Sequence, residues 1–247
     1  MPVFQLSEDL IFPPPSLADD DGLLAVGGDL SPERLLLAYA NGIFPWYTED
    51  EPILWWSPHP RCVLFPGKFN IPKSLRKFLR THNYQIRFDT NFVGVIRHCA
   101  SVQRPGQMGG TWITQQMQEA YIELHRLGFA HSVEVYEAEK LIGGLYGVAL
   151  GKVFYGESMF HLVPNASKLA LVALVTQLKQ WEFELIDNQQ TTPLLLQFGA
   201  EEIERDYFIE LLNSAVAKEG KVGSWNFIDD NDIQARLKEA IAHQQQT

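Results

Sequence analysis

Apolar residues recur at intervals of three and four along several segments of the chain, a pattern typical of amphipathic helices. In residues 114–128, Met117, Tyr121 and Leu124 share one face, Thr114 is placed to cap the helix, and Gly128 is placed to end it. This segment is therefore predicted to be a capped helix with one buried side.

Four more helices are predicted. Ser31 and Pro32 suit the cap and first residue of a helix that reaches about Ala40. The others are a short helix in residues 71–82, a long apolar helix from Asn165 through Trp181, and a final helix in residues 201–216.

Apolar and polar residues alternate in residues 131–160, which predicts β-strands. We expect three antiparallel strands with turns near Ala138–Glu139 and Gly151, and a further strand over residues 183–189. The order helix, strand meander, helix, strand, helix is an α+β pattern that resembles the acetyltransferase-like (GNAT) core. We expect a small N-terminal α/β domain in residues 1–62, a GNAT-like domain in residues 63–230, and a polar C-terminal surface extension in residues 231–247.

Length and composition narrow the class of protein. The 247 residues are 46% hydrophobic and 20% charged, which excludes a disordered, collagen-like or coiled-coil chain. No apolar run approaches the roughly 18–20 residues of a membrane span, and the first residues do not resemble a signal peptide. We therefore expect a cytoplasmic protein that makes no use of a membrane, with Cys62 and Cys99 as free thiols.

The net charge of −10 is unevenly distributed. Residues 52–118 contain one acidic residue, Asp89, and these nine basic residues: Arg61, Lys68, Lys73, Arg76, Lys77, Arg80, Arg87, Arg97 and Arg104. Lys73, Lys77 and Arg80 fall on one face of the short helix expected in residues 71–82. A solvated helix face would explain them, but basic residues without counter-charges favour a surface that binds a polyanion.

Two strands carry candidate chemistry. In residues 183–189, alternation places Asp187 and Gln189 on one face at the end of the strand, with Asn188 facing away. The alternative is that Asp187 caps the following turn. In residues 153–160, Glu157 shares a face with Met159 and needs a hydrogen-bonding partner there, either the backbone or a tyrosine in a structural role, or a substrate.

Several chemistries have no motif in the chain. There is no Walker sequence, no histidine or cysteine set at metal spacing, and no G-x-S-x-G turn. The pyrophosphate loop of acetyl-CoA users is missing as well. We therefore expect no metal and no cofactor, and an acyl donor other than coenzyme A.

The segments GIFPW, WWSP, GTWIT, GESMF and LIDNQ, in this order, resemble the leucyl/phenylalanyl-tRNA–protein transferase family over roughly residues 3–215. The resemblance implies an aminoacyltransferase that moves Leu, Phe or Met from aminoacyl-tRNA to the N-terminal Arg or Lys of a protein and so marks it for N-degron proteolysis. It also implies a monomer with a small N-terminal domain and a GNAT-like domain.

The same resemblance implies roles for single residues. Asp187 and Gln189 match the family's catalytic pair, and Glu157 matches its active-site carboxylate. The terminal adenosine and the aminoacyl side chain would be held by Trp46, Trp112, Leu145, Phe154, Met159, Leu171 and Ile186. The acceptor stem of the tRNA would lie along Lys73, Arg76, Lys77 and Arg80.

Three positions depart from the family pattern. Leu145 and Asn188 stand where many members have Met and Cys, and Leu194 stands where a His is common. Because Asn188 is expected to face away from the site, we expect no catalytic consequence from it. A non-catalytic tRNA-binding module is the alternative function, and a coenzyme A-dependent acetyltransferase is disfavoured because its loop is missing.

Overall fold

The N-terminal part of the protein is a four-stranded sheet with one helix. The computed structural model describes residues 3–82, 84–102 and 111–243. Strand β1 (Phe4–Leu6) lies parallel to β2 (Leu23–Gly27), while β4 (Leu54–Trp56) pairs antiparallel with both β2 and β3 (Phe44–Pro45). A 3₁₀ helix, η1 (Pro15–Leu17), follows β1. Helix α1 (Pro32–Ala40) begins as predicted, with Ser31 accepting a hydrogen bond from the Arg34 N–H.

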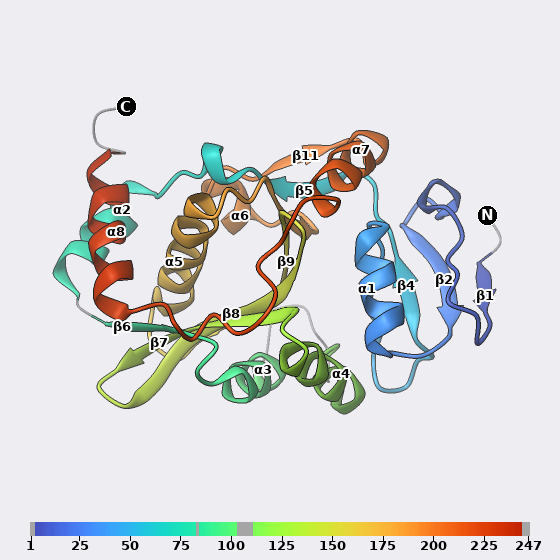
Figure 1. Ribbon diagram of the computed structural model, residues 1–247, viewed down its shortest axis with the longest axis horizontal. Helices are drawn as coiled ribbons and strands as arrows, with labels where there is room; N and C mark the ends of the chain where they lie inside the picture. Colours follow the sequence, from blue (N-terminus) through green and yellow to red (C-terminus); the bar gives the residue numbers. More distant parts are fainter. Residues whose placement is uncertain (1–2, 83, 103–110, 244–247) are drawn as a thin grey trace.

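The main part is built on a seven-stranded sheet with the order β11-β5-β10-β9-β8-β7-β6 (Figure 1). Its strands are β5 (Arg61–Leu64), β6 (Gln85–Phe88), β7 (Ala130–Glu137), β8 (Lys140–Leu150), β9 (Val153–His161), β10 (Leu185–Gln189) and β11 (Glu201–Ile203). The three-stranded meander and the later strand are confirmed. Only β9 and β10 are parallel neighbours in this sheet, and all the other pairs in it are antiparallel.

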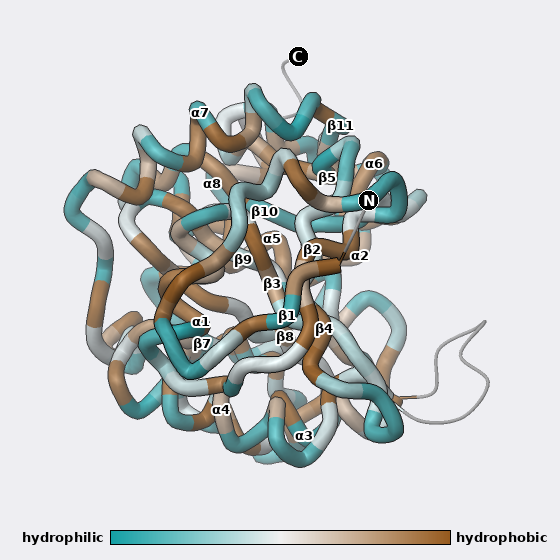
Figure 2. The backbone as a smooth tube through the Cα atoms, turned by 90° about the vertical axis from the view of Figure 1, so that its right-hand side faces the viewer, coloured by the Kyte–Doolittle hydropathy of each residue, from teal (hydrophilic) through white to brown (hydrophobic). Residues whose placement is uncertain are grey.

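Helices cover both faces of this sheet. Helix α5 (Ala166–Gln180) lies on one face, whereas α3 (Phe92–Ser101) and α4 (Gln115–Arg126) lie on the other (Figure 1). Helix α5 is apolar on nearly all sides, so it needs cover on its outer side as well as against the sheet. That cover comes from α8 (Asp230–His243) and the 3₁₀ helix η2 (Pro66–Lys68). The outer helices α3, α4 and α7 (Arg205–Val216) alternate between polar and apolar positions, as Figure 2 shows.

The C-terminal segment corrects two of the predictions. Residues 201–216 form strand β11 and then α7, and α7 is not the last helix. The expected polar surface extension is wrong for residues 230–243, because α8 buries Ile233, Leu237 and Ile241. Their spacing of four residues was readable as one apolar face, and each such side chain contributes about 1.5–3 kcal/mol by its burial. The mainly polar composition of the segment obscured that face.

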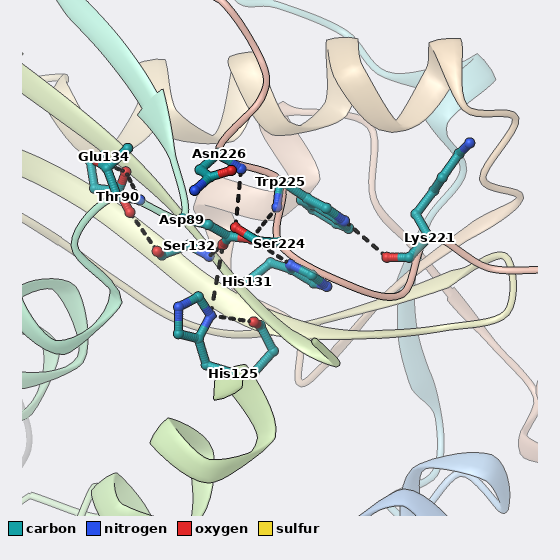
Figure 3. A network of polar contacts seen from close by, with 11 residues as sticks. Asp89, Thr90, His125, His131, Ser132, Glu134, Lys221, Ser224, Trp225 and Asn226 are labelled. Carbon is teal, nitrogen blue, oxygen red and sulfur yellow. Dashed lines mark hydrogen bonds and ion pairs between the residues drawn. The ribbon is translucent and has the colours of Figure 1, made fainter. Parts of the chain in front are cut away.

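A network of buried polar groups fastens the segment between α7 and α8 to the sheet (Figure 3). Asp89 accepts hydrogen bonds from the His131 ring at 2.8 Å, from the Ser132 N–H at 2.8 Å and from the Trp225 N–H at 2.7 Å. The Trp225 ring also stacks on His131, with ring centroids 3.6 Å apart. Asp89, the one acidic residue among positions 52–118, therefore has a structural role, and three hydrogen-bond donors satisfy its carboxylate.

The two parts of the protein share one apolar core. Tyr39 and Trp55 of the N-terminal part belong to the same cluster of buried side chains as Phe92, Tyr121 and Leu212 of the main part. Helix α1 packs on both α4 and α7. The N-terminal part is therefore packed against α4, α7 and β8 of the main part, and β5, which continues from it, already belongs to the main sheet.

The remaining elements are short. Helix α2 (Lys73–Thr81) is confirmed, and it exposes Lys73, Lys77 and Arg80 while burying Leu75. Helix α6 (Pro193–Gln197) follows β10. Over residues 3–82, 84–102 and 111–243, we find no helix with the length and apolar character that crossing a membrane requires.

Candidate active site

A cavity of about 580 Å³ opens where the two parallel strands of the main sheet separate. Strands β9 and β10 pair as far as Tyr155 and Asp187. Just beyond that point both strands are irregular. The β8–β9 register leaves Glu157 as an extra residue, and the β5–β10 register shifts between Asp187 and Gln189. Bulges of this kind bend a strand and redirect its side chains, which is how the sheet makes room for the cavity.

The structure brings together most of the residues predicted for the site. The cavity is lined by both Glu157 and Gln189 and by all seven residues predicted to hold the adenosine and aminoacyl groups: Trp46, Trp112, Leu145, Phe154, Met159, Leu171 and Ile186. Phe44, Pro45 and Trp46 reach it from the N-terminal part of the chain. The walls are therefore mainly apolar, with the carboxyl and the amide at one place on them, an arrangement typical of small-molecule sites.

Glu157 is held by two tyrosines from different helices. Tyr39 of α1 donates to Oε1 at 2.7 Å and Tyr121 of α4 donates to Oε2 at 3.1 Å, and the two hydroxyl oxygens are in contact with each other. Burial raises the pKa of Glu157 to about 7, although both tyrosine bonds oppose the rise because they favour the charged form. The structural partner expected for Glu157 is thus a pair of tyrosines. The carboxyl can also change charge near neutral pH.

Asp187 lies behind the cavity wall and does not line it. Its side chain is fully buried and forms a two-pronged ion pair with Arg61 of β5, with Nε to Oδ1 at 2.8 Å and the second nitrogen to Oδ2 at 2.6 Å. The Arg61 guanidinium lies between the rings of Phe44 and Phe208. Asp187 and Gln189 were predicted to form the site together, but of the two only Gln189 lines the cavity.

Gln189 has an unusual main-chain conformation. Its φ is +56°, a region that costs a residue other than glycine about 1–3 kcal/mol unless the surroundings hold it there. Its N–H donates to Asp187 Oδ1 at 3.0 Å, and the N–H of Gln190 bonds to the Asn188 carbonyl at 2.6 Å across it. This short turn ends β10 and points the Gln189 side chain toward Glu157.

The Gln189 amide can be placed in two orientations, and only the second keeps its oxygen away from other acceptors. In one, its nitrogen donates to Glu157 Oε1 at 3.3 Å. In the other, the nitrogen donates to the main-chain oxygens of Asn188 at 2.8 Å and Gly156 at 3.0 Å. The second orientation makes shorter bonds and turns the amide oxygen toward Glu157, which suits a protonated carboxyl. The amide oxygen is therefore placed to accept a hydrogen bond from the neutral carboxyl of Glu157.

The two bulges correct the predicted faces of both strands. Asn188 lines the cavity, so the expectation that it faces away is wrong. Glu157 and Met159 do not share a face. Glu157 bonds to tyrosines on the α4 side of the sheet, whereas Met159 packs with the α5 side. Alternation fails here because an extra residue in a strand reverses every side chain after it.

Sequence reasoning missed three polar residues of the site. Arg61 was counted only among the nine basic residues of positions 52–118, Tyr121 was placed on the apolar face of its helix, and Tyr39 was not singled out. All three are buried. Nothing local in the sequence marks them, because each meets its partner across 36 or more positions.

The predicted polyanion surface is only partly free of counter-charges. Arg61 pairs with Asp187, Lys68 with Glu201 at 2.6 Å, and Arg87 with Glu139 at 3.6 Å, so the expectation of nine unpaired cations is wrong for these three. In the described part of the chain, no carboxylate lies within 4.0 Å of the side-chain nitrogens of the helix-face residues, which are Lys73, Lys77 and Arg80. Arg76 is half-buried on the same helix, and Arg104 lies outside the described residues.

No group of three or more His, Cys, Asp or Glu side chains stands ready to hold a metal ion within residues 3–82, 84–102 and 111–243. The charged and polar groups of the cavity are a single carboxyl, amides, hydroxyls and an indole nitrogen. The chemistry available from the protein itself is therefore hydrogen bonding, proton transfer through Glu157, and binding of an apolar group.

A mixed α/β protein with a mainly apolar cavity and a titratable carboxyl at the break between two parallel strands has the features of an enzyme that binds a substrate with an apolar group. Two family models match the chain. Residues 28–59 match the N-terminal domain of leucyl/phenylalanyl-tRNA protein transferase, and residues 63–213 match the leucyl/phenylalanyl-tRNA protein transferase model. The chain belongs to this family and is an aminoacyltransferase.

Individual relatives match the sequence of this chain over nearly its whole length. The leucyl/phenylalanyl-tRNA–protein transferase of Syntrophobacter fumaroxidans is 57% identical over 225 residues, which are 91% of this chain and 96% of that one. The protein of the same name from Oleidesulfovibrio alaskensis is 51% identical over 234 residues, 93% of this chain and 94% of that one. In the solved structure of L-PGS from Bacillus licheniformis, 73% of the chain matches 90% of this one at 8% identity, but the TM-score is only 0.37. The GNAT-like assignment therefore stays a prediction.

Proposed function

We propose that this protein transfers leucine, phenylalanine or methionine from aminoacyl-tRNA to the α-amine of proteins that begin with Arg or Lys, which tags them for N-degron proteolysis. Family membership supports aminoacyl transfer from tRNA to protein. The observation that carries the substrate class is the cavity, whose apolar walls end at Glu157 and Gln189.

The aminoacyl side chain would lie among Leu145, Met159 and Leu171. Flexible apolar side chains fit leucine, phenylalanine and methionine with little preference, because one methylene changes the binding free energy by only about 1–3 kcal/mol. The terminal adenosine would stack on Trp46 or Trp112, an interaction worth roughly 1–3 kcal/mol per base. Trp46 suits this role because it is partly exposed at the cavity mouth.

The reaction is aminolysis of an ester. The nitrogen of the acceptor attacks the ester carbonyl carbon, a C–N bond forms, the C–O bond to the ribose breaks, and the ribose oxygen leaves with a proton. Part of the acceptor amine is already neutral at working pH because its usual pKa is near 8, and its nitrogen loses one more proton as the C–N bond forms. Glu157, with a pKa of about 7, is well matched to take that proton and pass it on. Gln189 would hold the amine beside it.

We propose further that Lys73, Arg76, Lys77 and Arg80 of α2 bind the acceptor stem, that the enzyme acts as a cytoplasmic monomer, and that the main domain, taken as residues 63–230, is GNAT-like. The exposure of the α2 cations supports the first of these. The strand break between β9 and β10, with the cavity inside it, supports the last.

The deciding experiment measures transfer of radiolabelled leucine from Leu-tRNA to a peptide that begins with Arg, against the same peptide beginning with Gly. Label is expected on the Arg peptide alone. Label on neither peptide, with the tRNA still bound, would instead favour a tRNA-binding module without catalysis. Phe-tRNA and Met-tRNA in the same assay rank the donors.

A further inference from the structure

Arg61 connects three separate parts of the protein behind the cavity wall. It comes from β5, its guanidinium carbon lies 5.1 Å from the ring of Phe44 in β3 and 4.6 Å from the ring of Phe208 in α7, and its fork holds the carboxylate of Asp187 in β10. Both charged side chains are almost fully buried, at 1% and 0% exposure. The two parallel bonds of this fork fix the plane of the Asp187 carboxylate.

Asp187 is badly placed to take a proton from a substrate. Oδ1 accepts from both Arg61 Nε and the Gln189 N–H, and Oδ2 faces the second Arg61 nitrogen. The carboxylate does not line the cavity. A general base must come within hydrogen-bonding distance of the proton that it takes, directly or through one water, and Asp187 lies behind the wall of the cavity where the substrate would bind.

What Asp187 does control is the conformation of Gln189. A positive φ persists at a residue with a side chain only where neighbouring groups fix it. At Gln189, with φ of +56°, the bond from its N–H to Asp187 Oδ1 is such a fixing contact. This conformation in turn brings the Gln189 amide to the side of Glu157.

From this chain of contacts, and resting on the proposed aminoacyl transfer, we infer that Arg61 is a positioning residue for the reaction. It fixes the Asp187 side chain through the fork, and that side chain fixes the main chain of Gln189 so that its amide meets the substrate amine. Asp187 takes no proton at any step; the proton of the amine goes to Glu157.

The test is a rescue experiment in the leucine transfer assay. Asp187→Asn leaves the Arg61 charge buried without its partner, and we expect kcat to fall at least 100-fold. The double variant Arg61→Gln/Asp187→Asn leaves no unpaired charge in the interior. Its new amide oxygen at position 187 can still accept a hydrogen bond from the Gln189 N–H. We expect the double variant to regain at least tenfold over Asp187→Asn, with the acid limb of its kcat/KM profile at the wild-type pH. If Asp187 is the base, the double variant is as inactive as Asp187→Asn, because an amide cannot take a proton, and the inference is overturned.

Arg61→Lys tests the same inference without changing the charge. Lysine loses the fork, so we expect kcat to fall at least tenfold while KM for Leu-tRNA and for the Arg peptide changes less than twofold; an unchanged kcat, or a change in KM alone, overturns the inference. The matched control is Arg34→Lys, because Arg34 is an equally buried arginine that pairs with Asp29 and with main-chain oxygens of residues 7–9 away from the cavity. It should lower Tm and leave kcat unchanged. If the wild-type enzyme transfers no leucine, the proposed function itself is refuted. This result distinguishes a failure of the proposed function from a failure of the inference about Arg61.

Discussion

At the scale of single residues, the site depends on the free-energy cost of ionising one carboxyl group, that of Glu157. Glu157 is half-buried, lines the cavity and has its pKa raised to about 7 by burial. A carboxyl whose pKa is higher in the folded protein than in the unfolded chain contributes its full stability at pH values below its unfolded pKa, and that contribution is lost as the pH rises through 7. The enzyme therefore gives up some stability near the pH at which Glu157 becomes useful as a base.

The variant Glu157→Gln separates these two effects. Glutamine keeps the shape and stays neutral, so the variant should gain stability relative to wild type as the pH rises from 5 to 8, by roughly 2 kcal/mol. Its transfer rate should fall at least 100-fold, a loss at the lower end of what removing a general base costs. Urea unfolding at the two pH values and the leucine transfer assay measure both. An equal stability difference at pH 5 and pH 8 would contradict the raised pKa.

Removing one tyrosine hydroxyl should move the pH profile. The bond from Tyr121 favours the charged form of Glu157 and so lowers its pKa. In Tyr121→Phe the pKa of Glu157 is expected to rise, and the acid limb of the kcat/KM profile should shift to higher pH. Tyr136→Phe, on β7 and not bonded to Glu157, is the control and should leave the limb in place. A limb that stays or moves down in Tyr121→Phe would exclude Glu157 as its origin.

The residues of the site were predictable only where they lie on the strands or resemble the family pattern. Glu157, Gln189 and the seven wall residues line one cavity, as the family resemblance implied, although the predicted face of Glu157 was wrong. Arg61, Tyr39 and Tyr121 were not predicted, because their chemistry comes from partners brought close only by the complete fold. Asn188 was placed on the wrong face because no feature of the sequence signals the bulge beside it.

At the scale of elements, the tight contact between β8 and α5 shows how glycine sets the position of a helix. A Cβ on Gly143 would lie 2.5 Å from the Ala166 Cβ and 3.0 Å from the Ala166 carbonyl carbon. Helix α5 also carries Leu171 and Leu174 of the cavity wall. Any side chain at residue 143 must therefore push this wall away from the sheet.

Gly143→Ala is accordingly expected to destabilise the protein by about 1–3 kcal/mol, the usual cost of overpacking a core. Gly67→Ala is the control, because nothing lies within 4 Å of the Cβ that it would add. Urea unfolding of both variants checks the difference. Equal midpoints would mean that α5 moves without cost.

Helices were easier to predict than the short strands. Periodicity and caps gave α1, α2, α4 and α5 nearly to the residue, since these signals are local. Strands β5 and β6 have only four residues each, and although β6 alternates between polar and apolar residues, four residues are too few to distinguish either from loop. Both are defined by their neighbours in the sheet, and such pairing is invisible in a single segment.

At the scale of the whole molecule, charge is divided between two ends. Residues 1–60 contain ten acidic residues and one basic residue, whereas α2 exposes Lys73, Lys77 and Arg80 at the opposite end of the view in Figure 1. This separation explains how a chain with a net charge of −10 can bind a polyanion. The tRNA would be steered toward α2 and away from the N-terminal part.

The salt dependence of tRNA binding measures this division. Changing Lys73, Lys77 and Arg80 together to Ala should weaken binding and make the slope of log K against log salt shallower by about 2, since each lost phosphate contact removes roughly 0.7–0.9. The control changes Arg126, Lys140 and Lys218, which are exposed on other elements, and alters the net charge equally. Equal slopes for the two triple variants would show that α2 is not the binding surface.

The position of β5 in the sheet also bears on how the chain is made. This strand follows the N-terminal part directly, yet both its neighbours come late, since Val63 pairs with Asp187 on one side and with Glu201 on the other. A ribosome must therefore translate most of the gene before β5 has a partner, and until then Arg61 has no carboxylate to hold. Pairings between such distant segments form slowly. The active site is thus among the last parts of the nascent protein that can assemble, and a truncated translation product that stops before β10 has no means of forming it.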